Sequence, residues 1–586
     1  MAGLAGDFLI LAFFGLGSTA QGLRITFEAA HSASSPGEVY FWLGHALFLF
    51  PACCLLGYSL APRLGPVLAH SWAALGSLSR RKTFLGLFAI FLLAVFVARV
   101  GRIAVLYDLP FTDDEYAVEF GGHIMATGHV TAPRSLPEAA LPTLGLYLKD
   151  GQISRADWPG AQAVWALAEL TRLGPFVWAL LAAVPILALG TLMARRLGTG
   201  WGFVACIVFL CSPMALMLSL TTHAHLASRA MLALAVAGYW FSQRRGTLGG
   251  WTLTGLAFGL GFLCRPLEIV FFSAPLLLWA VAQSLRGMPG YRRALPGLVL
   301  GGIIPLLLML AHSYAVTGHP LVPPRMTDSH DIAAVTLWVR FGANMAYNTF
   351  MLAIWFLGPL GVILIGAGVM TDHFTRLLGL GVLTDLLLAL FHTNMGLHSV
   401  GPIHYSECAV PLTVIAVHGL ANLLRGAREH RFDLTPIASA FALALFIGLG
   451  IFNVLHALAL QEQARIQRDI YAWIDRSVYE PSGKKAVVLA PQFAAIWIQV
   501  PWMRQLGTQV FEWRRPRLDL SDDVLILHDR IGVEAWLRER MSERRLFRIE
   551  LRPEAPYAQL RPLDAGSPIP WCGSSPGLPT CGPSGR

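Results

Sequence analysis

The chain has 586 residues, of which 55% are hydrophobic and only 13% are charged. A soluble domain carries about 25% charged residues, so this chain holds too little charge to cover a water-facing surface of its size. Its net charge of +9 comes from Lys and Arg residues between apolar blocks, with no nucleic-acid-binding motif. These properties exclude a soluble enzyme and a nucleic-acid-binding protein, and they predict an all-α polytopic membrane protein.

Apolar runs of roughly 20 residues, the length that crosses a hydrocarbon core, predict about 13 transmembrane helices. Residues 1–82 would hold two of them and a cytoplasmic loop, with the first run retained rather than cleaved as a leader. Residues 83–457 would hold the others as one transmembrane core. The predicted spans lie near 5–22, 40–61, 83–105, 175–193, 201–219, 226–242, 248–264, 267–284, 295–315, 349–370, 377–392, 408–424 and 436–457.

Clusters of Lys and Arg fall in alternate connectors, which orients the spans. By the positive-inside rule these connectors are cytoplasmic, and so is the N-terminus. The loop at 108–175, the loop near 317–342 and everything after about Leu458 are then extracytoplasmic. The basic residues are Arg80, Arg81, Lys82, Arg195, Arg196, Arg244, Arg245, Arg286, Arg292, Arg293, Arg425, Arg428 and Arg431.

The tail at 458–586 contains short strand-like and helix-like segments, which predict a small extracytoplasmic α/β domain. Residues from about Asp564 onward are expected to be disordered. Cys572 and Cys581 would pair if the tail faces an oxidising compartment. The predicted strands lie at 486–490, 509–513, 524–528 and 546–551, and the predicted helices at 493–503 and 533–541.

Three consecutive acids, Asp113, Asp114 and Glu115, directly follow the third predicted span and therefore lie at the membrane surface. Acids there cost free energy unless they are paired or used. One interpretation is structural, because Thr112 and Glu115 fit a capping box and the two aspartates suit the positive start of a helix. The other is catalytic, because a carboxylate held there can take a proton from an acceptor hydroxyl.

A helix that begins at Asp113 places Glu119 and His123 on the same face as Glu115. With His129, these carboxylate and imidazole groups are also legitimate ligands, so a divalent cation is an open alternative. The opposite, apolar face would consist of Tyr116, Phe120 and Ile124.

Four further segments accompany this acidic stretch. In chain order they are WPGA at 158–161, GLGFLCRP at 259–266, YAVTGHP at 314–320 and GPIHYSE at 401–407. Over about residues 83–424 the chain resembles the GT-C superfamily of polyprenyl-phosphate-sugar glycosyltransferases, whose relatives include protein O-mannosyltransferases and the lipid A aminoarabinose transferase. It departs from them at His404, where relatives carry Arg, and at Asp157-Trp158-Pro159, where the aminoarabinose transferase carries Lys-Pro-Pro.

The resemblance implies an inverting glycosyltransferase in a bacterial inner membrane. It would move a monosaccharide from a polyprenyl-phosphate carrier to a periplasmic or other extracytoplasmic acceptor, which could be a glycan, a lipid or a protein. The catalytic Asp of the family's Asp-Glu pair corresponds to Asp114. Asp113 and Glu115 would position that base or the acceptor.

Donor phosphate binding is expected at Arg265, because guanidinium pairs bidentately with phosphate oxygens. His404 can donate one hydrogen bond even when it is neutral. Tyr405 and Glu407 lie beside it and complete this group. Glu268 follows Arg265, and neither charge suits a lipid-facing position.

Other side chains could contact the substrate, whereas Lys149 and Arg155 are interpreted as surface charges of the outer loop. Apart from the possible cation, the sequence requires no cofactor. The further substrate-binding candidates are Glu119, His123, His223, His225 and Trp158.

Two other functions stay open. A transporter or flippase for a lipid-linked or anionic substrate would carry charges inside its spans and repeated broken helices. A non-catalytic assembly protein would use the outer domain to bind a partner. The charge-poor spans and the single acidic stretch outside them favour the transferase.

Overall fold

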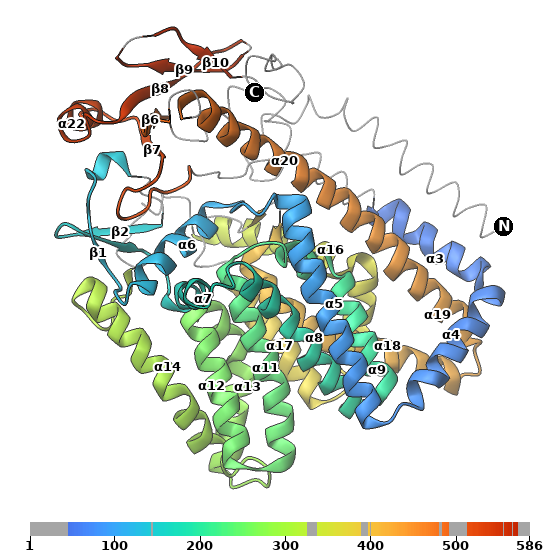
Figure 1. The fold of residues 1–586 in the computed structure, drawn as a ribbon. Coiled ribbons are helices and arrows are strands. Elements are labelled where there is room, and N and C mark those ends of the chain that lie inside the picture. The colour runs from blue at the N-terminus through green and yellow to red at the C-terminus, as the bar shows by residue number, and fades with distance from the viewer. Residues whose placement is uncertain are drawn as a thin grey trace. The chain divides into compact units, whose positions relative to one another are not determined.

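The structure is a computed structural model that describes residues 45–141, 145–324, 337–387, 397–398, 400–479, 483–491, 513–554, 556–564 and 566–571. The chain divides into two compact units. The first comprises residues 1–101, 175–309 and 330–457, and the second comprises residues 102–174, 310–329 and 458–586. Figure 1 labels their helices and strands.

The first unit is built almost entirely from helices, with one two-stranded antiparallel sheet of β4 (Leu397–His398) and β5 (Gly401–Pro402), which confirms the predicted helical membrane fold. Seven helical segments among the described residues are long and apolar enough to cross a bilayer, or eight if α3 and α4, bent by 84°, form one broken span. Its helices are α3 (Phe50–Ser59), α4 (Ala61–Gly76), α8 (Phe176–Arg196), α9 (Thr199–Cys211), α10 (Pro213–Leu218), α11 (Ala224–Arg245), α12 (Leu248–Cys264), α13 (Pro266–Leu285), α16 (Leu337–Val369), α17 (His373–Leu386), α18 (Ala409–Glu429) and α19 (Leu434–Leu443). Three helices, α5 (Arg80–Leu106), α14 (Ala294–Thr317) and α20 (Leu449–Val478), begin in this unit and end in the other.

The predicted number of about 13 spans is not confirmed. Helices α9 and α12 have 13 and 17 residues, which is short for a complete crossing. The predicted span near 201–219 is interrupted, because α9 ends at Cys211 and Pro213 starts α10. The span predicted near 349–370 contains a break at Leu357 and Gly358. The apolar run near 5–22 lies outside the described residues.

Helices α16 and α18 pack closely through glycines. Gly368 of α16 and Gly419 of α18 leave no room for a Cβ atom, because it would overlap the backbone of Ile415 or Leu364 on the facing helix. Small residues at helix contacts allow backbones in a membrane to approach and to gain dispersion energy. The α16–α18 contact therefore depends on these two glycines.

We expect Gly419→Ala to destabilise the protein. The added Cβ would overlap the carbonyl oxygen of Leu364, and a backbone atom cannot turn aside as a side-chain end can. Overpacking of this kind costs about 1–3 kcal/mol, which would lower the midpoint of thermal unfolding in detergent.

Gly426→Ala on the same helix is the matched control. A Cβ at Gly426 has no atom within 4 Å, so the substitution should leave the unfolding midpoint unchanged or raise it through better helix propensity. Equal midpoints for the two variants would contradict the close packing.

The second unit contains two sheets with helices beside them. A three-stranded antiparallel sheet has the order β1 (Ala132–Pro133), β3 (Gln152–Arg155), β2 (Leu146–Lys149). A five-stranded sheet has the order β10 (Ile569–Pro570), β9 (Ala558–Pro562), β8 (Arg545–Leu551), β6 (Ala486–Ala490), β7 (Val524–His528). Strand β6 pairs in parallel with β7 and β8, and the other pairs are antiparallel. The helices are α6 (Asp113–Ala126), α7 (Pro159–Leu170) and α22 (Val533–Arg540).

These elements confirm the predicted α/β character of the tail. Strands β6, β7 and β8 and helix α22 match four predicted elements, whereas the helix predicted at 493–503, most of the strand predicted at 509–513 and the disulfide between Cys572 and Cys581 lie outside the described residues. The prediction of disorder from about Asp564 is wrong for β10. That strand pairs with β9, and the neighbouring Trp571 is buried.

The outer loop and the tail share one apolar core within the second unit. Side chains of the loop, such as Phe120 and Ile124 of α6, cluster with Val487 of β6, Leu525 of β7 and Leu546 of β8. The residues that follow the third predicted span are therefore folded against the tail rather than forming an open loop.

Candidate functional site

The candidate residues form one group in each unit. The acidic cluster of the second unit consists of Asp113, Asp114 and Glu115 at the start of α6, with Arg102. The imidazole–carboxylate cluster of the first unit consists of His225, Arg265, Glu268, His404 and Glu407.

Helix α6 begins as the structural interpretation of the acids predicted. Thr112 is the N-cap, and its hydroxyl accepts a hydrogen bond from the backbone N–H of Glu115 at 3.4 Å. The Glu115 carboxylate accepts from the backbone N–H groups of Phe111 at 2.7 Å and of Thr112 at 3.2 Å, which completes the capping box. Glu115 is fully buried, so it positions the helix and is not open to a substrate.

Arg102, which the sequence analysis did not single out, holds this arrangement in place. Its guanidinium donates to Glu115 at 3.0 Å, to Asp108 at 3.1 Å and to the carbonyl of Leu109 at 3.1 Å. An arginine within an apolar run, followed by acids, was the available signal. Asp108 and the preceding Tyr107 both have positive φ, of 58° and 54°, so this turn is held in the left-handed region.

Asp113 and Asp114 occupy the first turn of α6 and are only partly buried. Their carboxylates complement the positive end of the helix dipole. Because Glu115 is committed to the cap and to Arg102, the two aspartates are the acids of this stretch that retain solvent exposure. A rigidly placed and partly exposed carboxylate can act as a general base.

Glu119 and His123 meet a third group, Glu169 of α7. The Nδ1 of His123 lies 2.6 Å from a Glu169 oxygen, and its Nε2 lies 3.7 Å from a Glu119 oxygen. Glu119 above all, and then Glu169, raises the pKa of His123 above its ordinary value. These residues form a surface-proximal charge network across α6 and α7.

The possible cation site at Glu115, Glu119, His123 and His129 is not supported. Within the described part of the chain, these four side chains are not among the groups close enough to share an ion. The physical reason is that both oxygens of Glu115 are already engaged by the cap and by Arg102.

Three candidate residues of the outer loop differ in their burial and contacts. Arg155, interpreted as a surface charge, is in fact buried and pairs with the buried Asp157. Trp158 is the N-cap residue of α7, and its backbone N–H donates to Asp157 at 2.9 Å. Lys149 is exposed, as expected, and donates to the carbonyl of Thr317 at 2.9 Å.

The imidazole–carboxylate cluster brings together residues from three segments. His225 lies in the first turn of α11, Arg265 is the N-cap of α13, and Glu268 lies in the first turn of α13. His404 and Glu407 lie in the 3₁₀ segment η5 (Ile403–Cys408), just before α18. The structure therefore places Arg265 and His404, both predicted phosphate ligands, side by side.

Arg265 links two members of this cluster. Its Nε donates to Glu268 at 2.9 Å, and its Nη2 lies 3.2 Å from the Nδ1 of His404. Glu268 is almost completely buried, so its charge is matched inside the unit rather than by water. A guanidinium placed this way can contact a further anion only if its present partners yield or share it.

Glu407 orients His225. Its carboxylate lies 3.0 Å from the Nδ1 of His225, and it accepts hydrogen bonds from Ser228 and from Ser406, the latter at 3.0 Å. His225 and Glu407 are buried completely or nearly so. The chain separation of 182 residues explains why sequence inspection did not pair them.

The remaining candidates surround this cluster. His223 is buried, and its ring centroid lies 6.4 Å from that of His225. Tyr405 is fully buried and interrupts the helical geometry of η5 with a φ of −120°. Asp385 of α17, which was not predicted, accepts a hydrogen bond from Cys408 at 3.2 Å.

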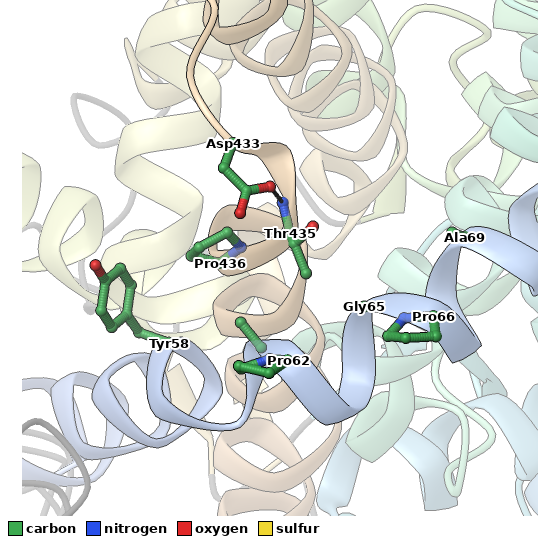
Figure 2. Close-up of a pocket in the computed structure, with 9 residues that line it drawn as sticks. Tyr58, Pro62, Gly65, Pro66, Ala69, Asp433, Thr435 and Pro436 are labelled. Atoms are coloured by element: carbon green, nitrogen blue, oxygen red, sulfur yellow. Dashed lines mark hydrogen bonds between the residues drawn. The ribbon is translucent and has the colours of Figure 1, made fainter.

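Figure 2 shows a separate pocket of the first unit, where α3 and α4 face the start of α19. Tyr58, Pro62 and Pro66 line one side. Asp433 lies opposite, but it caps α19 by accepting the backbone N–H of Thr435 at 2.9 Å. This pocket contains none of the predicted site residues, and its carboxylate already has a structural role.

No protein-family model and no curated protein sequence matches the chain. Among solved structures it is similar to ArnT from Cupriavidus metallidurans bound to undecaprenyl phosphate, with 12% identity, a TM-score of 0.49, and coverage of 78% of this chain and 92% of that chain. It is also similar to the Archaeoglobus fulgidus oligosaccharyltransferase in the apo form, with 9% identity, a TM-score of 0.43, and coverage of 79% and 69%. Both proteins are GT-C members.

We expect the ion pair of His123 with Glu119 to make stability depend on pH. Because the folded protein raises the pKa of His123, the contribution is fully present below the ordinary His pKa of about 6.5 and is lost as pH rises through the folded value. Glu119→Gln should therefore lower the thermal unfolding midpoint at about pH 5 and have less effect at about pH 8.

The same substitution in a His123→Gln background provides the control. Without the imidazole, Glu119→Gln should have an effect that does not vary between the two pH values. A pH-dependent loss that persists in that background would assign the effect to another group.

Proposed function

We propose that the chain is an inverting glycosyltransferase that moves a monosaccharide from a polyprenyl-phosphate carrier to an extracytoplasmic acceptor. The observation that carries the proposal is the start of α6. Two partly exposed aspartates are held there by a buried cap and the Arg102–Glu115 ion pair, just after an apolar 27-residue helix. The ordered motifs that resemble the GT-C superfamily support the same assignment.

Asp114 is assigned as the general base. It would accept the proton of an acceptor hydroxyl as that oxygen attacks the anomeric carbon of the donor sugar. The bond between sugar and phosphate breaks, its electron pair remains on the phosphate oxygen, and the anomeric configuration inverts. Asp113 would orient the acceptor, and Glu115 acts through the cap as a positioning residue.

The donor phosphate is assigned to Arg265 in the first unit. Its guanidinium is charged at any accessible pH and presents several N–H groups in one plane. His404 lies within hydrogen-bonding distance of it and is a second candidate donor, while the buried Tyr405 and Glu407 support the segment that carries His404. Phosphate charge that is stabilised in this way makes the lipid phosphate a better leaving group.

Asp114→Asn should abolish transfer but leave binding of the lipid phosphate intact. Amide oxygen is too weak a base to take the proton, and loss of a general base costs about 10²–10⁴-fold in rate. The measurement is release of free polyprenyl phosphate by purified protein across a panel of polyprenyl-phosphate sugars, with binding of the carrier phosphate measured separately.

Asp150→Asn is the matched control, because Asp150 is an exposed acid of the same outer loop and asparagine tolerates its positive φ of 50°. It should transfer at the wild-type rate. Full activity of the Asp114 variant would remove this residue from the mechanism. Movement of intact lipid-linked sugar across vesicles without cleavage would instead establish the transporter.

Arg265→Gln should weaken binding of the carrier phosphate by about 10- to 100-fold, the range expected when a charged hydrogen bond is lost. Arg286→Gln, an exposed arginine at the other end of α13, provides the control and should bind normally. Unchanged carrier binding in the Arg265 variant would place the phosphate elsewhere.

A further inference from the structure

The imidazole–carboxylate cluster has the ligand set of a divalent-metal site. One nitrogen of His225, one nitrogen of His404 and one carboxylate oxygen of Glu268 all lie within 4.8 Å of one another. Two imidazoles and a carboxylate are a known ligand combination for zinc with an open fourth position. We propose that these three residues bind a divalent transition-metal ion of the zinc class.

The hydrogen bonding of His225 leaves one nitrogen for the ion. Its Nδ1 faces the Glu407 carboxylate at 3.0 Å and therefore carries the proton. Its Nε2 then holds a lone pair and, within the described residues, has no hydrogen-bond partner although the side chain is only 1% exposed. A buried lone pair without a donor is unfavourable, and coordination of a metal ion satisfies it.

Glu407 supplies the second layer that metal-binding histidines require. A carboxylate behind the imidazole fixes its tautomer and raises its basicity toward the metal. Ser228 and Ser406 also donate to Glu407, so this carboxylate is itself held in place. The chain Ser228–Glu407–His225 thus directs Nε2 without taking part in coordination.

The local charge is compatible with a cation. The cluster itself holds two carboxylates, Glu268 and Glu407, and one guanidinium, Arg265. With neutral imidazoles this leaves one carboxylate in excess within the cluster, which favours a cation between the two imidazoles.

Arg265 is the group that the ion would displace. It donates to Glu268 and lies within hydrogen-bonding distance of His404, two of the three metal ligands. Zinc bonds of about 2.0–2.2 Å require ligand atoms to lie roughly 3.4 Å apart, so the three atoms, which lie within 4.8 Å of one another, have to draw closer when the ion binds. The released guanidinium could then bind an anion. That last step rests on the proposed function, whereas the metal site does not.

The test uses the purified full chain, stripped with a chelator and titrated with Zn²⁺ alone. Wild-type protein should retain equimolar zinc after dialysis, and Co²⁺ in its place should show the strong visible absorption of a tetrahedral site with imidazole ligands. His225→Ala, His404→Ala and Glu268→Gln should each lose the retained metal. Glu407→Gln should bind it about tenfold or more weakly, because it acts through His225.

His129→Ala is the control, because His129 is an exposed imidazole outside the cluster. It should retain metal as the wild type does. Monodisperse elution and an unchanged unfolding midpoint show which variants are folded. If His225→Ala does not fold, the metal retained by His404→Ala and the Co²⁺ spectrum of the wild type test the site instead. Failure of the wild type to retain metal, or equal retention by all variants, overturns the site.

The two proposals fail separately. A chain that retains zinc through these residues but never releases lipid phosphate keeps the metal site and loses the transferase. A chain that transfers sugar at full rate and retains no metal keeps the transferase and loses the site.

Discussion

The buried ion pair between Arg102 and Glu115 is the contact on which the acidic cluster depends. Taking two charges out of water is costly, and such a pair persists only when its remaining hydrogen-bonding capacity is satisfied. Here Arg102 also binds Asp108 and a carbonyl group, and Glu115 also caps α6. The direction of the first helical turn, and hence of Asp114, follows from this fully used pair.

The same constraint shapes the first unit. Its apolar helices are interrupted where polar side chains occur: Arg265 ends α12 and caps α13, and a 3₁₀ segment carries His404 and Glu407 ahead of α18. The terminal N–H and C=O groups of a helix have no partner within the helix. A helix end can therefore place polar side chains inside the unit without breaking hydrogen bonds of a regular helix. A buried polar cluster can therefore exist among helices whose central residues carry few charges.

Local signals in the sequence predicted local structure well. Thr112 and Glu115 cap α6 as the capping-box pattern indicates, and short strand-like segments of the tail located β6, β7 and β8. Long-range pairing was beyond such signals. The sequence did not reveal that Arg102 binds Glu115, or that Glu268 lies beside two histidines. The contact of His225 with Glu407 joins residues far apart in sequence. The number of spans is likewise not confirmed, because the length of an apolar run does not reveal a break such as the one at Pro213.

Because α6 shares an apolar core with β6, β7 and β8, the C-terminal region does not form an independent domain. A chain shortened after about residue 458 would leave Phe120 and Ile124 facing water, on the same helix whose first turn carries the acids. Fusion, truncation or domain exchange at that boundary would thus disturb the acidic cluster, which lies more than 300 residues earlier in the chain. The hydrogen bond between Tyr116 of α6 and Tyr471 of α20 spans 355 residues in the same way.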